Sequence, residues 1–201
     1  MNDSCYNLPM RKIPAVIALL ILLFLYASCA TTGQKATGKA SVFITDSKSV
    51  SVLPPRYMDG ILDELQLFSG SFGEGTFSSL AYIRADQGGI DITLLNEMGL
   101  DMGKLSYDGT DISFSSPYFP KEIKAAYIVM DIQHAYYSVS ALEKVYEDTG
   151  LAFVCGKVDG KEVRRVLDGD AIIEEVVKDG ETVTITNFLR GYQYKLRKVD
   201  E

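Results

Sequence analysis

Repeated turn signals between short alternating segments constrain this fold more than any other feature of the sequence. Asp-Gly pairs occur at positions 59–60, 108–109, 159–160, 168–169 and 179–180. Asp-Gly favours the two-residue turn of a β-hairpin, because both residues tolerate the positive φ that this turn needs. Apolar and polar residues alternate between the turns, as in residues 77–83, 90–94, 98–102, 182–186 and 192–197. This alternation predicts an antiparallel sheet with one face against a core.

One central segment breaks the strand pattern and predicts a buried helix. Residues 121–137 follow Pro120 without a glycine or proline, and residues 125–130 are all apolar. A helix that is apolar nearly all round must be covered nearly all round. Ser138 or Ser140 would begin a second helix over residues 141–148, and four more strands would follow. The predicted fold class is therefore α+β and mainly β, with a curved, unclosed antiparallel sheet that wraps a central apolar helix.

The N-terminal segment has the anatomy of a secretory signal. Residues 15–27 are thirteen consecutive apolar residues, which is too short for a spanning helix but typical of a signal peptide. Arg11 and Lys12 precede this run, and the nine residues before Met10 add nothing that a signal requires, so we expect translation to start at Met10.

The end of the apolar run indicates a lipid anchor. Ala27-Ser28-Cys29 resembles the lipobox of bacterial lipoproteins, in which the Cys thiol is acylated and becomes the new N-terminus. This resemblance implies a signal peptide over residues 1–28, lipidated Cys29 followed by a flexible tether to residue 41, and a folded domain over residues 42–201. Ala30 after the Cys implies an outer-membrane location facing the periplasm. An ordinary signal cut near residues 27–30, or an uncleaved anchor, is the alternative.

Composition excludes several classes of function. The net charge of −7 and the absence of a basic stripe argue against a nucleic-acid partner. His134 is the single histidine, the cysteines are at positions 5, 29 and 155, and tryptophan is absent. These counts argue against a metal site, a disulfide framework and a catalytic triad, so we expect neither an enzyme nor a cofactor. Cys155 ends an apolar run and is expected to be a buried core residue.

Three short motifs carry a resemblance to a known family. Leu53-Pro54-Pro55, Tyr107-Asp108-Gly109 and Asp131-Ile132-Gln133, in this order, resemble a bacterial lipoprotein family of unknown function that belongs with the LolA/LolB-like half-barrels. The resemblance covers residues 50–199, with Tyr136-Tyr137 where the family tends to carry a Trp-Pro or similar pair. It implies an unclosed barrel around an apolar cavity that holds an acyl chain, lipid or lipoprotein, with a delivering carrier as a possible partner.

A cavity of that kind would be lined by the inward residues of the curved sheet and of the central helix. The same residues would simply form a core if the barrel were filled, and the protein would then be a structural or interaction lipoprotein without a ligand. The predicted lining residues are Phe77, Ile83, Ile92, Leu94, Leu100, Met102, Tyr127, Met130, Val183, Ile185 and Tyr194.

Asp131, Gln133 and His134 form a polar cluster at the end of the central helix. They are a candidate clasp for a ligand headgroup or a candidate acid–base pair, although the structural alternative is that Asp131 and Gln133 satisfy neighbouring backbone groups.

Other charged or glycine-rich pairs point to no site. Glu174 and Glu175 are adjacent on a predicted strand and would face opposite sides, which excludes a glycosidase pair. Arg164-Arg165 is expected on a solvated sheet face. The glycine-rich residues 70–75 predict a hairpin turn, because no phosphate-loop Lys follows them.

Overall fold

The computed structural model describes residues 34–37, 40–118 and 124–199 of the chain. The predicted start at Met10, the signal peptide and Cys29 lie outside these residues. No helix in the described part of the chain has both the length and the apolar character needed to cross a membrane.

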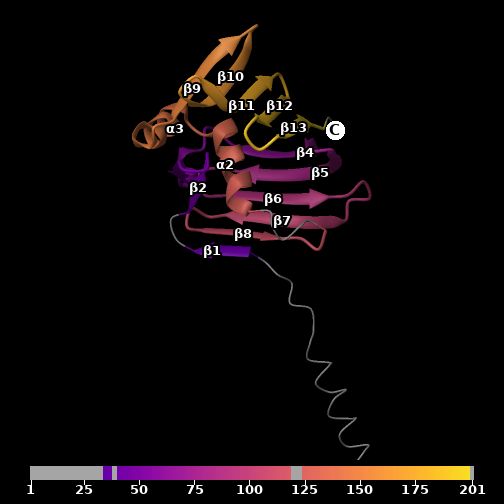
Figure 1. The fold of residues 1–201 in the computed structure, drawn as a ribbon. Helices are drawn as coiled ribbons and strands as arrows, with labels where there is room; N and C mark the ends of the chain where they lie inside the picture. The colour runs from indigo at the N-terminus through magenta and orange to yellow at the C-terminus, as the bar shows by residue number, and fades with distance from the viewer. Residues whose placement is uncertain (1–33, 38–39, 119–123, 200–201) are drawn as a thin grey trace, which may run out of the picture. The chain divides into compact units, whose positions relative to one another are not determined.

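One large antiparallel sheet dominates the described residues (Figure 1). Its strands follow in chain order within two meanders, and β13 pairs with β4 to join them. Strands β1 and β9 are the two edges and do not pair with each other in the described structure, so the sheet is not closed. In spatial order the strands are β1 (Gln34–Thr37), β8 (Asp111–Ser115), β7 (Asp101–Tyr107), β6 (Ile90–Leu95), β5 (Gly75–Ala85), β4 (Leu62–Phe72), β13 (Tyr192–Lys198), β12 (Thr182–Asn187), β11 (Ala171–Asp179), β10 (Lys161–Asp168) and β9 (Ala152–Val158).

Most of the predicted turn signals coincide with the ends of these strands. Four of the Asp-Gly pairs lie at hairpin turns, between β7 and β8 and at each turn from β9 to β12. Asp159 and Gly160 have φ values of 51° and 81°, as a two-residue turn with both positions left-handed requires. Asp59-Gly60 is different, because it precedes β4 and does not connect paired strands. The prediction of a mainly β, unclosed antiparallel sheet is confirmed.

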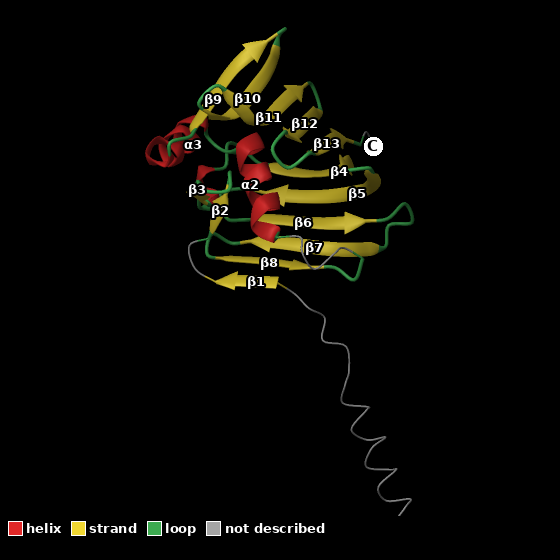
Figure 2. Ribbon diagram, in the orientation of Figure 1, coloured by secondary structure: helices red, strands yellow, loops and turns green. Residues whose placement is uncertain are grey.

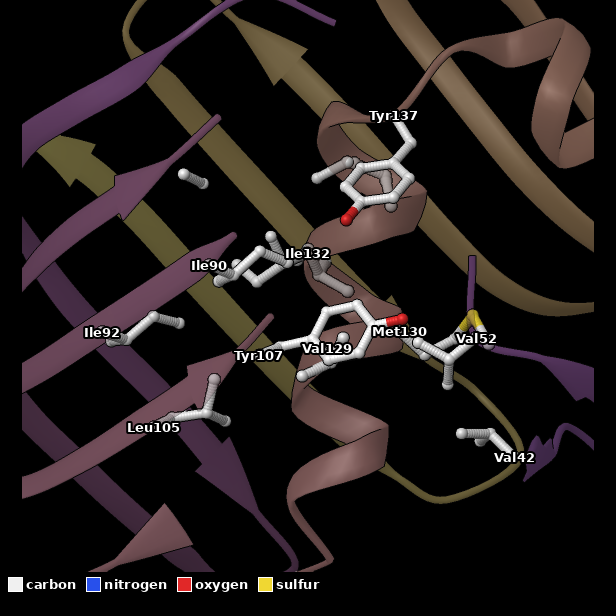
Figure 3. Packing of buried hydrophobic residues seen from close by; sticks show 14 of the residues in the cluster. Val42, Val52, Ile90, Ile92, Leu105, Tyr107, Val129, Met130, Ile132 and Tyr137 are labelled. Atoms are coloured by element: carbon white, nitrogen blue, oxygen red, sulfur yellow. The ribbon is translucent and has the colours of Figure 1, made fainter. Parts of the chain in front are cut away.

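Two helices connect the meanders (Figure 2). Helix α2 (Ala125–Tyr136) contacts β8 and β12 of the large sheet and also β2 (Ser41–Phe43), which pairs with β3 (Ser49–Ser51). Figure 3 shows Ile90, Ile92 and Leu105 on one side of α2 and Val42 and Val52 on the other. This double cover explains why α2 is apolar on nearly all sides. Helix α3 (Val139–Tyr146) follows, and the short 3₁₀ helices η1 (Pro55–Tyr57) and η2 (Glu147–Thr149) complete the elements.

Several predictions of local structure were wrong. Five strands follow the helices where four were predicted, and Gln34–Thr37 forms β1 within the predicted tether. The second helix begins at Val139, two residues earlier than predicted, although Ser138 is its N-cap residue as one of the two predicted alternatives required. Cys155 is exposed rather than buried, because it lies on the edge strand β9. The central helix is described from Ala125, and residues 119–123 before it lie outside the described residues.

The strand predicted over residues 98–102 was also wrong. Residues 96–100 form a turn, in which Oδ1 of Asn96 accepts hydrogen bonds from the backbone N–H groups of Met98 and Leu100, at 3.0 and 2.9 Å. Met98 and Leu100 are therefore 78% and 59% exposed. A bulge beside Leu94 and Leu95 then sets the register of β7. A bulge cannot be recognised from alternation alone, because it shifts the alternation by one residue.

Candidate functional site

An apolar pocket of about 610 Å³ lies between helix α2 and the inward face of the large sheet. Its wall combines residues of both meanders, and the pocket therefore depends on the β4–β13 pairing that joins them. The lining residues are Phe68, Phe72, Phe77, Ala81, Ile83, Ile92, Leu94, Leu105, Phe114, Lys124, Tyr127, Ile128, Asp131, Ile132, Ile185, Arg190, Tyr192, Tyr194 and Leu196.

Helix α2 contributes one stripe of its surface to this pocket. Lys124, Tyr127, Ile128, Asp131 and Ile132 line it, and their spacing of three or four residues places them on one helical face. The exposure of the stripe residues differs between the two ends of the helix. Lys124 is exposed at the N-terminal end, whereas Asp131 is 3% exposed two turns further on.

An aromatic cluster forms the opposite wall. The rings of Phe68 and Phe77 meet edge to face at a centroid distance of 4.9 Å, and the rings of Phe68 and Tyr194 do so at 5.4 Å. Gly70 permits this packing, because a Cβ at position 70 would lie 2.5 Å from the carbonyl oxygen of Gln193 and 2.8 Å from the Phe77 ring. The predicted hairpin turn over residues 70–75 is thus shorter than expected, with Gly70 inside strand β4.

The structure brings seven of the eleven predicted lining residues into the pocket wall. These are Phe77, Ile83, Ile92, Leu94, Tyr127, Ile185 and Tyr194.

The remaining four lie elsewhere. Leu100 is exposed in the β6–β7 turn, so its inward orientation was predicted wrongly, and Met102 packs partly buried against the core without lining the pocket. Val183 is a buried core residue outside the wall. Met130 is buried beside Val52 on the other side of α2 (Figure 3).

A buried network of hydrogen bonds borders the pocket at Asp131. The hydroxyl of Tyr192 donates to the Asp131 carboxyl group, with oxygen–oxygen distances of 2.9 and 3.0 Å. Nδ1 of His134 lies 2.6 Å from Oε1 of Glu174, and Nε2 of His134 lies 2.7 Å from the Tyr146 hydroxyl. A proton on Nδ1 would let His134 donate to Glu174 while Nε2 accepts from Tyr146.

Burial governs the charge of this network. Loss of water raises the pKa of Asp131 well above its ordinary value, and the neighbouring Glu174 raises it further. The Tyr192 hydroxyl and Arg190 oppose this rise. Burial also raises the pKa values of Tyr192 and Tyr194, so both phenols stay neutral and can donate hydrogen bonds. Burial therefore favours the neutral form of the Asp131 carboxyl group.

Asp131, His134 and Glu174 are also the described residues whose ligand atoms lie close enough to hold a metal ion, within 4.8 Å of one another. Each of these groups already has a hydrogen-bond partner inside the protein. The second carboxylate oxygen of Glu174 accepts from Nδ2 of Asn187 at 3.0 Å. The hydrogen bonds account for the geometry of the cluster without a bound ion.

The Gln133 side chain is hydrogen-bonded to a neighbouring backbone segment. Its Oε1 accepts from the backbone N–H of Leu53 at 3.0 Å, and its Nε2 donates to the Leu53 carbonyl at 2.7 Å. Gln133 thus pairs with a neighbouring backbone, as the structural alternative predicted. Asp131 does not, because its partner is the Tyr192 side chain.

Sequence reasoning missed several residues of the site. Arg164, predicted on a solvated face, is 4% exposed and donates through Nη1 to the carbonyls of His134 and Tyr137 at the end of α2. Glu174 was not predicted as a site residue, because Glu174 and Glu175 would face opposite sides of a strand and could not form a glycosidase pair. A register shift beside Val166 and Leu167 leaves Ile173 unpaired on β11, and Glu174 then faces inward. Tyr192 alternates in phase with Leu196, which was an available signal for an inward residue.

The fold and the pocket define a class: an open antiparallel sheet packed on an apolar helix, with an internal space large enough for a small apolar ligand. The chain matches the family described as Protein of unknown function (DUF3261) over residues 63–200, and it belongs to that family. The prediction that the chain belongs to a family of unknown function is confirmed, whereas the link of that family to lipoproteins and to LolA/LolB-like half-barrels stays a prediction. None of the curated proteins searched matches the chain.

Proposed function

We propose that this protein is a membrane-anchored envelope lipoprotein that binds or transfers acyl chains, as lipids or as lipoproteins, in the pocket beside α2. The pocket of about 610 Å³ carries this proposal, because its wall is built almost entirely from aliphatic and aromatic side chains. Pockets for small ligands range from about 300 to 1,000 Å³ and are mostly apolar.

The energetics of the pocket favour a hydrocarbon ligand. Each methylene group moved from water into an apolar site contributes about 0.8 kcal/mol, so a chain of about sixteen carbons gains about 13 kcal/mol before the cost of ordering it. The wall needs no hydrogen bond from such a chain at Asp131, because the Tyr192 hydroxyl already donates one to the Asp131 carboxyl group. A chain seated there leaves no buried polar group without a partner at these positions.

We also propose that the large sheet is curved into a half-barrel around α2. Helix α2 contacts β8 and β12, which are six places apart in the sheet order. Six inter-strand steps would span about 29 Å in a flat sheet, whereas a helix of twelve residues is about 18 Å long. A curved sheet brings both strands to the helix, which supports a LolB-like half-barrel with α2 inside it.

The anchor and the location rest on the sequence. The apolar run of residues 15–27 and the lipobox at Cys29 support a lipid-anchored protein in the bacterial envelope, at the outer membrane. The alternative, a structural or interaction lipoprotein with a filled barrel, requires the inward residues to fill the space that the pocket occupies. The described pocket therefore favours the carrier.

Lipid analysis of the full-length protein purified from membranes tests this proposal. We expect organic extraction to release non-covalently bound acyl lipid in near-stoichiometric amount. Ala81 lines the pocket, so Ala81→Phe should fill part of it and reduce the extracted lipid. The matched control is Leu80→Phe, which adds the same side chain at the neighbouring position on the other face of β5. Absence of lipid from wild type, or equal lipid in both variants, would contradict the proposal.

A further inference from the structure

We infer that the pocket takes a single acyl chain with an anionic headgroup, held at the pocket's charged end by Arg190 and Lys124. This inference rests on the proposed function and goes further, because it names the class of ligand. It depends on two observations: the volume of the pocket and the cationic groups in its wall.

The volume favours one chain. The pocket of about 610 Å³ lies within the range of about 300 to 1,000 Å³ that is typical of sites for one small ligand. A single-chain lipid is a ligand of that size, whereas a diacyl phospholipid or a triacylated lipoprotein carries two or three such chains.

The charge at one end of the pocket indicates the headgroup. Arg190 lies in the β12–β13 turn, where its backbone N–H donates to Oδ1 of Asn187 at 2.8 Å. Its guanidinium lies 4.6 Å from the centroid of the Tyr127 ring and donates to the carbonyls of Phe43 and Ile44 and to the Tyr127 hydroxyl. These contacts fix the guanidinium at the pocket wall.

Arg190 keeps capacity for a further anion. A guanidinium has five N–H donors, and three are used in these hydrogen bonds, so two have no partner among the described residues. No carboxylate of the described residues forms an ion pair with Arg190 or with Lys124. A carboxylate or phosphate on the ligand supplies a negative charge, and the free N–H groups of Arg190 can donate charge-assisted hydrogen bonds to either group.

Lys124 lies on the same side of the pocket. It precedes Tyr127 by three residues, so the two side chains are neighbours on one face of α2, and Tyr127 contacts Arg190. The stripe then continues through Ile128 to the buried side chain of Asp131. An amphiphile with its headgroup at Lys124 and Arg190 places its hydrocarbon along Tyr127 and Ile128, towards the apolar end of the pocket.

Competition binding to the full-length protein tests this inference. A fluorescent fatty acid serves as the probe, and the competitors are palmitate, 1-palmitoyl lysophosphatidate, monopalmitin, hexadecyltrimethylammonium and dipalmitoyl phosphatidylcholine. We expect the two anionic single-chain lipids to compete about tenfold more strongly than neutral monopalmitin, and the cationic and diacyl lipids to compete less than monopalmitin. A difference between palmitate and lysophosphatidate identifies whether a carboxylate or a phosphate is preferred.

Charge removal at the two cations provides the second readout. Lys124 is exposed, so Lys124→Gln should preserve the fold while it weakens palmitate several-fold more than it weakens monopalmitin. Arg190→Gln should do the same more strongly, with folding checked by thermal unfolding because Arg190 also binds the β2 segment. The matched control is Lys157→Gln, an exposed charge removed on β9 away from the pocket.

The outcomes distinguish failure of the inferred ligand class from failure of the proposed function. Equal competition by palmitate, monopalmitin and the ammonium lipid overturns the anionic headgroup but leaves an acyl-chain pocket. Competition by the diacyl lipid as strong as that of palmitate overturns the single chain. If neither the fluorescent fatty acid nor any competitor binds, the proposed function itself fails.

Discussion

Replacing Asp131 by Asn should change how the stability of the protein depends on pH. Asp131 is 3% exposed, accepts two hydrogen-bond contacts from Tyr192 and lies beside Glu174. Burial and Glu174 raise the pKa of Asp131 above its ordinary value of 3.8. The carboxyl group is therefore neutral in the folded protein over a pH range in which it is ionised in the unfolded chain. Asn keeps the size and the hydrogen-bonding capacity of the side chain but cannot ionise.

The sign and the magnitude follow from linkage. Because the folded pKa is raised, the contribution of Asp131 to stability is fully present below the unfolded pKa and is lost as the pH rises through the folded pKa. Between the two values, wild type loses up to about 1.4 kcal/mol of unfolding free energy per pH unit relative to a variant that does not titrate. The free energy of unfolding of Asp131→Asn minus that of wild type should therefore increase with pH.

Urea unfolding at pH values from about 4.5 to 8 measures this difference. Effects of pH on the rest of the protein are common to both forms and cancel in the subtraction. The control variant is Asp46→Asn, at an exposed position in the turn between β2 and β3, and the increase with pH should be steeper for Asp131→Asn than for this control. Equal slopes for the two variants, or a difference for Asp131→Asn that falls with pH, would contradict the claim that burial favours the neutral form of Asp131.

Two further predictions concern the walls of the pocket and the position of α2. Gly70→Ala places a Cβ 2.5 Å from the Gln193 carbonyl oxygen and should lower the unfolding free energy by about 1–3 kcal/mol, whereas Gly156→Ala on β9, where a Cβ meets nothing within 4 Å, should change it little. Arg164→Met leaves the carbonyls of His134 and Tyr137 without their buried donor and should cost about 3 kcal/mol in chemical unfolding. The neighbouring Arg165→Met breaks a half-exposed pair with Glu175 and should cost less than about 1 kcal/mol; equal costs for the two would contradict this assignment.

The alternation of residues predicted the sheet well where the pairing is regular. Ile90, Ile92 and Leu94 face inward on β6, and Val183 and Ile185 do so on β12, as period two requires. The apolar helix was also predictable, because the run from Ala125 to Met130 has to be covered on all sides, and β2 supplies the cover that the large sheet does not.

The parts of the site that the sequence did not predict depend on bulges and on long-range pairing. Glu174 faces inward because Ile173 is an extra residue on β11, and a run such as Ile172 to Val177 does not reveal where an extra residue lies. Arg190 reaches the pocket only because β12 and β13 bring their turn against β2 and α2. Contacts of this kind join residues more than sixty positions apart, so local periodicity carries no information about them.

The absence of tryptophan from the chain permits a direct measurement of the central claim, that an acyl chain occupies the pocket beside α2. Phe77→Trp places a single fluorophore in the pocket wall, and Tyr82→Trp places one on the opposite, exposed face of the same strand. A dibrominated stearate quenches tryptophan on contact. The account predicts saturable quenching of the Phe77→Trp protein, complete at one fatty acid per chain, and no saturable quenching of the Tyr82→Trp protein. Equal quenching of both, or no quenching of Phe77→Trp, would contradict it.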